Sequence, residues 1–278
     1  MKRYRVLSYD FDTRANILSK EIGENWQPHI KEMWQRNKYQ ITQGLMAEYG
    51  SINSEGKIKN FCDMGAMPIS LIAFHNNFFR QARSAFVIGA YYPALTALCS
   101  LGERVLNHLM LLFRNDFKNT EEYKAVHRKD SFDNWDLAIN TLEKWGVLLP
   151  AASTSFRLLR DLRNKALHFN PDTDTNDREL ALEANNLFIK IINEQFSGFG
   201  VLPWYIEGTL GATFVKKNYE SYPFVEKIVL PNCGNVGFMH LLEAGSSGWV
   251  VVDNYEYDNR EVTDEEFCNL FNNRNHSA

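Results

Sequence analysis

Apolar residues recur at helical spacing along most of the chain up to about residue 198. Apolar side chains three and four positions apart fall on one face of a helix, so this pattern predicts helices that pack together. The segments predicted to be helical are 12–48, 68–88, 93–114, 133–145, 153–168 and 178–196. Segment 93–114 is apolar on most of its circumference, which places it at the centre of the expected bundle.

Prolines and polar side chains mark the expected helix ends. Pro68 suits the first turn of helix 68–88, and Pro93 begins the next helix. Asp133 is the expected N-cap of helix 133–145. The polar segments 51–60 and 115–132 are expected to be connections between helices.

Short β-rich runs replace the helical pattern after Gly198. The segments expected to be extended are 3–11 near the start of the chain and then 201–206, 212–216, 225–230, 236–242 and 248–252. Gly, Pro and Asn separate the later runs, as in turns between antiparallel strands. Thr263 and Glu266 have the spacing of a capping box, which predicts a short final helix.

Together these elements predict a mainly α fold, an up-and-down helical bundle followed by a small C-terminal α+β region. Three segments are expected. Residues 1–64 form a strand and helix segment that packs on the bundle, residues 65–198 form the bundle, and residues 199–278 form a small β-rich domain.

The composition fits a folded protein and narrows its partners. Apolar residues make up 45% and aromatic residues 13% of the chain, which excludes a disordered chain. The formal net charge of -4 argues against a protein that coats nucleic acid, but it allows a local basic site.

No feature of the sequence predicts a metal, a cofactor or a membrane anchor. The cysteines are Cys62, Cys99, Cys233 and Cys268, spaced too widely for a zinc knuckle or a redox pair. The longest apolar run, 85–101, is shorter than a bilayer span, and the first residues have no signal-peptide core. We therefore expect a cytoplasmic protein with reduced thiols.

Segment 153–168 contains a basic cluster. Its cationic side chains are Arg157, Arg160, Arg163 and Lys165, and His168 ends the segment. A guanidinium group stabilises the charge that develops on a phosphate, and a histidine moves protons near neutral pH. Asn164 adds an amide that orients the histidine or the phosphate. These groups suit metal-free cleavage of RNA.

The sequence RDLRNKALHF in this segment resembles the signature of the HEPN superfamily (higher eukaryotes and prokaryotes nucleotide-binding). That signature is an arginine, a polar residue, several more residues and then a histidine. The upstream sequence AYYPALTALCSLGERVLNHLMLLFR is similar to the second helix of the family and carries one internal acid, Glu103. The resemblance covers about 69–198. It implies a bundle that dimerises with the two motifs facing each other.

The resemblance also implies roles for individual residues. Arg163 would bind and stabilise the scissile phosphate, Asn164 is the polar residue after it, and His168 would be the acid/base group. We expect further contacts with the substrate from Arg157, Arg160, Lys165 and Glu103. For Glu103 there are two interpretations, an ion pair with an arginine, such as one from the motif helix, and a catalytic carboxylate.

Two other features limit these expectations. Some family members carry a tyrosine shortly after the histidine, which a partner nucleotidyltransferase modifies, but here Phe169, Asn170 and Pro171 follow His168. His75 and His108 lie in apolar helical segments, so we expect them to be core histidines rather than ligands.

Many HEPN proteins are metal-independent endoribonucleases of toxin–antitoxin and anti-phage systems. The resemblance thus implies a cytoplasmic, homodimeric endoribonuclease, a hydrolase that binds RNA and acts as a toxin or antiviral defence effector. An antitoxin or a sensor protein is the expected partner, with no membrane partner. The alternative is a non-catalytic HEPN-like module that binds a nucleotide, RNA or another protein.

Overall fold

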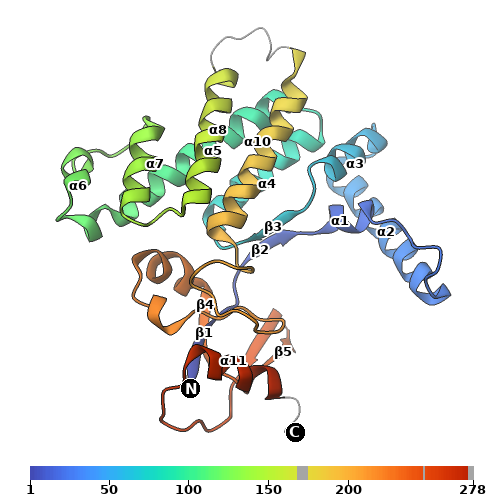
Figure 1. Ribbon diagram of the computed structural model, residues 1–278. Coiled ribbons are helices and arrows are strands. Elements are labelled where there is room, and N and C mark those ends of the chain that lie inside the picture. Colours follow the sequence, from blue (N-terminus) through green and yellow to red (C-terminus); the bar gives the residue numbers. More distant parts are fainter. Residues whose placement is uncertain (168–174, 247, 275–278) are drawn as a thin grey trace. The chain divides into compact units, whose positions relative to one another are not determined.

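The computed structural model of the protein describes residues 1–167, 175–246 and 248–274 (Figure 1). The chain divides into two compact units. Residues 10–196 form the first, here called the bundle unit. Residues 1–9 and the chain from residue 197 onward form the second, here called the terminal unit. The fold is mainly α, as the sequence predicts.

Helices build most of the bundle unit. The long ones are α2 (Pro28–Tyr49), α4 (Ala73–Val87), α5 (Tyr91–Phe113), α8 (Pro150–Leu167) and α10 (Asp177–Ile191). Shorter ones are α1 (Arg14–Ser19), α3 (Ser54–Asp63), α6 (Glu121–Val126) and α7 (Trp135–Lys144), with a 3₁₀ turn at Arg114–Phe117 and a π-helical turn at Ile192–Phe196. None of the helices in the described part of the chain is both long and apolar enough to cross a membrane.

Helix α5 is the centre of the bundle unit, as its apolar sequence predicts. It packs against α4, α7, α8 and α10 (Figure 1). Its side chains Leu98, Leu106 and Phe113 are almost completely buried. Gly102 allows its neighbours to come close. A Cβ atom there would lie 2.7 Å from side-chain atoms of both Leu159 on α8 and Trp135 on α7.

Several predicted boundaries were wrong, for local reasons. Pro68 lies in strand β3 (Met67–Ser70), which pairs antiparallel with β2 (Asp10–Asp12), and α4 begins only at Ala73. A proline is tolerated there because each strand of a two-stranded sheet has a free edge. The loop predicted over 51–60 contains the start of α3, which follows Asn53 in a left-handed conformation with φ 52°.

The predicted N-cap of helix 133–145 was wrong by one residue. Asn134, not Asp133, caps α7, because its side-chain oxygen accepts a hydrogen bond from the backbone N–H of Leu137 at 3.0 Å. The prediction of one continuous helix over 12–48 was also wrong. Helix α1 ends at Ser19 and α2 begins at Pro28, where a proline fits the first turn.

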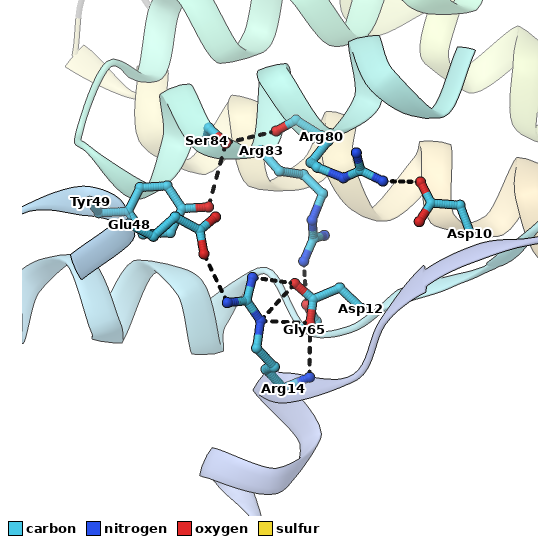
Figure 2. Close-up of polar contacts among 9 residues, drawn as sticks. All are labelled: Asp10, Asp12, Arg14, Glu48, Tyr49, Gly65, Arg80, Arg83 and Ser84. Atoms are coloured by element: carbon cyan, nitrogen blue, oxygen red, sulfur yellow. Dashed lines mark hydrogen bonds and ion pairs between the residues drawn. The ribbon is translucent and has the colours of Figure 1, made fainter. Parts of the chain in front are cut away.

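A polar network joins the first residues of the bundle unit to its helices (Figure 2). Arg14 donates to the carboxylate of Asp12 at 2.8 Å and to Glu48 on α2 at 2.8 Å. Arg80 on α4 pairs with Asp10. These contacts tie the strand β2 and helix α1 to α2 and α4.

Arg83 on α4 lies at the buried side of this network. It is only 5% exposed and donates to the side-chain oxygen of Asn185 on α10 at 2.9 Å. It also donates to the carbonyl of Gly65 at 2.5 Å (Figure 2). Burial lowers the pKa of Arg83 to about 10, and the nearby Asp12 carboxylate opposes that shift. Arg83 therefore remains charged at neutral pH and holds α10 to the end of α3.

In the part that the structure describes, the terminal unit combines strands with an α-helix and short 3₁₀ and π-helical turns. Strand β1 (Lys2–Val6) pairs antiparallel with β4 (Cys233–Gly237), with Tyr4 opposite Asn235. Strands β5 (Leu241–Gly245) and β6 (Gly248–Val252) form a hairpin. Helix α11 (Asp264–Asn273) begins at Thr263, whose hydroxyl accepts from the N–H of Glu266 at 3.1 Å, so the predicted capping box is confirmed.

The core of this unit forms around Phe214. Phe267 and Phe271 of α11 pack edge-on against its ring, with centroids 4.9 Å and 4.8 Å away. Three expected strands were wrong in kind or extent. Segment 225–230 contains a π-helical turn at Val225–Val229, followed by a 3₁₀ turn at Leu230–Asn232, and the runs 201–206 and 212–216 meet at the single bridge between Tyr205 and Val215.

Candidate functional site

Helix α8 carries the basic motif and is fixed by its apolar face. Phe156, Leu159 and Ala166 are buried against the neighbouring helices, which leaves the basic residues at the edges of the contact. Asn164 and Lys165 are exposed. His168 follows the last residue of α8 and lies outside the residues that the structure describes.

Arg163 lies where α8 meets α5. Its Nη2 atom is 3.0 Å from Oε2 of Glu103 on α5, and its guanidinium carbon is 6.0 Å from the centre of the Trp135 ring. The indole N–H of Trp135 donates to the same Glu103 oxygen at 3.2 Å. Of the two interpretations of Glu103, the ion pair with an arginine of the motif helix is therefore the one that the structure shows.

The ion pair with Glu103 holds the guanidinium of Arg163, but part of the side chain remains accessible. The side chain is 25% exposed, and its Nη1 atom lies 3.5 Å from the side-chain oxygen of Asn164. Its buried Nε atom has no hydrogen-bond partner among the described residues. A planar guanidinium group that is held in position and partly exposed is suited to contact a phosphate.

The other arginines of α8 line its contact with α7. Arg157 donates to Asn140 at 2.8 Å and to Glu143 at 2.7 Å. Arg160 pairs with Asp136 and with Asp161, the latter at 2.7 Å, and the hydrogen bond to Asp161 raises the pKa of Arg160. Glu143 and Asp136 thus connect these two arginines to α7, whereas Arg163 pairs with Glu103 on α5.

A cavity of about 640 Å³ opens beside Glu103, and sequence reasoning missed it. It is lined by His75 of α4 and by Glu103, Arg104, Asn107, His108 and Leu111 of α5. The residues of α5 recur at helical spacing. They form a polar stripe on an otherwise apolar helix, and this stripe was the available signal in the sequence.

Two histidines meet in the wall of this cavity. His75 is 4% exposed, and its Nε2 atom lies 2.9 Å from Nδ1 of His108. Burial lowers the pKa of His75 to about 4, helped by His108 and Arg104, and burial also lowers the pKa of His108. The expectation of two core histidines was wrong for His108, which is exposed on α5.

The chain matches no protein-family model, no curated protein and no solved structure. Within the described part of the chain, no three His, Cys, Asp or Glu side chains are grouped so that they could hold a metal ion. The site is thus described by its own geometry, an arginine held by a carboxylate at the contact of α5 and α8, beside a cavity that contains a histidine pair.

Proposed function

We propose that the protein is a metal-independent endoribonuclease of the HEPN type. The observation that carries the proposal is the position of Arg163, which Glu103 and Trp135 hold at the contact of α5 and α8 with part of its guanidinium exposed. A cation fixed before the reaction stabilises the developing phosphorane without reorganisation. His168, five residues further along the chain, is the proton-transfer group of the proposal.

The proposed reaction is an internal transesterification of RNA. One histidine removes the proton of a 2′-hydroxyl, the 2′-oxygen attacks the adjacent phosphorus, and the bond from phosphorus to the 5′-oxygen breaks. A second histidine gives its proton to the leaving 5′-oxygen. The products are a 2′,3′-cyclic phosphate and a 5′-hydroxyl. A homodimer with facing motifs supplies the two copies of His168, and single-stranded RNA is the substrate because its 2′-hydroxyls are accessible.

Cleavage in EDTA tests this proposal. The purified protein is incubated with single-stranded RNA, and the products are examined by gel and end-group analysis. We expect wild type to leave 2′,3′-cyclic phosphate ends, and His168→Ala and Arg163→Ala each to abolish cleavage. Arg36→Ala, on the exposed surface of α2, is the control. Circular dichroism and size-exclusion chromatography establish that each variant is folded and keeps its oligomeric state. Cleavage that survives both motif substitutions would overturn the site.

A non-catalytic HEPN-like binding module is the second candidate. The observation in its favour is that carboxylates of the same chain already engage the motif-helix arginines, as Arg157 with Glu143 and Arg163 with Glu103. Ion pairs of this kind also serve a structural role.

Expression in a bacterial host separates the two candidates. A ribonuclease toxin arrests growth as wild type and not as His168→Ala, which fits the proposed role as a toxin or defence effector held in check by a partner protein. A binding module is harmless in both forms.

A further inference from the structure

Arg104 is the arginine that lines the cavity beside Glu103. Its guanidinium carbon lies 4.7 Å from the centre of the Phe78 ring, and the side chain is exposed. Among the described residues no carboxylate pairs with Arg104, unlike the arginines of α8. Stacking on an aromatic ring fixes a guanidinium group while its N–H donors stay available to a ligand.

The acid next to Arg104 does not neutralise the cavity. Glu103 is the one carboxylate in its described lining, and this carboxylate already accepts from Arg163 and Trp135. Two arginines therefore flank one carboxylate, and the cavity keeps a net positive charge. This charge favours an anionic ligand.

The histidine pair adds a directed donor. The contact between Nε2 of His75 and Nδ1 of His108 uses one nitrogen of each ring. An anion in the cavity favours the tautomer in which Nδ1 of His108 accepts a hydrogen bond from Nε2–H of His75, while Nε2–H of His108 donates to the anion. His75 is buried in α4 and holds the ring of His108 through this contact. His75 is therefore a positioning residue.

Asn107 lines the same cavity but has a structural role. Its side-chain nitrogen donates to the carbonyls of Glu103 and Phe132, both at 2.9 Å, and its oxygen accepts from the N–H of Phe132 at 2.6 Å. Its donors and its acceptor are thus occupied within the chain. Arg104 and His108 remain as the groups for a ligand.

We propose that this cavity is a second phosphate subsite, in which Arg104 and His108 bind a phosphodiester of the RNA strand whose neighbouring phosphodiester contacts Arg163. Glu103 connects the two subsites, because it lines the cavity and pairs with Arg163. The inference rests on the proposed ribonuclease function. It adds that the enzyme contacts more than the scissile phosphate and that the substrate strand crosses α5.

Binding of an uncleavable strand tests the subsite. The probe is a fluorescent single-stranded 2′-O-methyl oligoribonucleotide, which lacks the attacking hydroxyl, and its affinity is measured by anisotropy over a series of salt concentrations. A single-stranded phosphate contact contributes about 0.7 to the slope of log K against log salt. We expect Arg104→Gln to weaken binding about tenfold and to reduce that slope by about 0.7. Arg36→Gln, which removes an exposed charge from α2, should change neither.

The imidazole ¹⁵N signals of His108 provide a second readout. In wild type they should move toward the Nε2-protonated form when the oligonucleotide is added, and His75→Phe should abolish this preference. Arg104→Lys keeps the charge without the fork of donors and should recover part of the affinity. The variants are compared only after circular dichroism confirms their fold.

The outcomes separate the subsite from the ribonuclease. If wild type cleaves RNA and Arg104→Gln keeps its KM, affinity and salt slope, the subsite is wrong and the function stands. If wild type cleaves no RNA but Arg104→Gln loses binding and slope, the function is wrong and the cavity still binds a phosphodiester. If adenosine monophosphate moves the His108 signals and the oligonucleotide does not, the cavity serves a small phosphorylated ligand and the proposal is overturned.

Discussion

Glu103 on α5 and Arg163 on α8 lie 3.0 Å apart between Oε2 and Nη2, and Trp135 of α7 donates to the same carboxylate oxygen. Three helices therefore determine where the motif arginine points. This arrangement makes Glu103 a positioning residue for Arg163 in the proposed ribonuclease.

Glu103→Gln tests that role. The amide keeps a side-chain oxygen for the N–H of Trp135 but loses the charge that holds Arg163. We expect RNA cleavage to fall about tenfold in kcat, a loss of about 1.4 kcal/mol of transition-state stabilisation. Because both partners are partly exposed, the free energy of unfolding should fall by only about 1 kcal/mol or less.

Glu143→Gln is the matched control, because it removes the carboxylate that pairs with Arg157 on the other side of α8. Its kcat should stay near that of wild type. Equal losses in the two variants would contradict a specific role for Glu103.

Gly102→Ala should destabilise the bundle unit by about 1–3 kcal/mol, because the added methyl group overlaps Leu159 and Trp135 at 2.7 Å. Urea denaturation measures the change. Gly44→Ala is the control in α2, where a Cβ atom meets nothing within 4 Å. Alanine in that open helical position should stabilise the protein by about 0.5–1 kcal/mol. Changes of the same sign would show that the packing around Gly102 is loose.

Acid should weaken the fold through His75. Its ordinary pKa of 6.5 falls to about 4 in the folded protein, so between these values the unfolded chain binds a proton that the folded chain does not. The free energy of unfolding therefore falls as the pH drops from 6.5 to 4, by up to about 3 kcal/mol from this group.

Urea denaturation of wild type and His75→Gln across this pH range measures the effect. We expect wild type to be the more stable at pH 7, and the difference between the two proteins to shrink as the pH falls. If the difference in the free energy of unfolding stays constant between pH 6.5 and 4, folding does not lower the pKa of His75.

Arg83 and Arg80 lie on the same helix and should respond very differently to substitution. Arg83→Ala leaves the buried side-chain oxygen of Asn185 and the partly buried carbonyl of Gly65 without their donor, and should lower the free energy of unfolding by about 3 kcal/mol. Arg80→Ala removes an exposed pair with Asp10 and should cost less than about 1 kcal/mol. Thermal and urea unfolding compare the two, and similar losses would contradict the structural role of Arg83.

The hydrophobic periodicity predicted the helices whose apolar pattern is continuous along their length. Helix α5 is apolar along its length and α8 has a clear apolar face, so both were predicted close to their observed bounds. Segments whose state depends on distant partners were not predicted. Pro68 is in a strand because β2 pairs with it from more than fifty residues earlier in the chain, and α3 follows a left-handed Asn53 that no local pattern announces.

The candidate site shows the same division. The motif arginine was predicted, and an ion pair of Glu103 with an arginine of the motif helix was one of its two interpretations, because both residues belong to strongly patterned helices. The contact between His75 and His108 was not, because the two residues lie 33 positions apart on different helices. Single residues on separate helices leave no spacing to detect, and only the packing of α4 against α5 brings them together.

The pairing of β1 with β4 imposes an order on folding during synthesis. Residues 2–6 are made before the bundle unit, and their partners at 233–237 are made after it. Domains fold as units during synthesis, and the ribosome adds roughly 5–20 residues per second. The bundle unit therefore has time to fold before the partner of the first strand is made. The terminal unit then closes last, and a chain that stops before residue 233 lacks the partner of its own first strand.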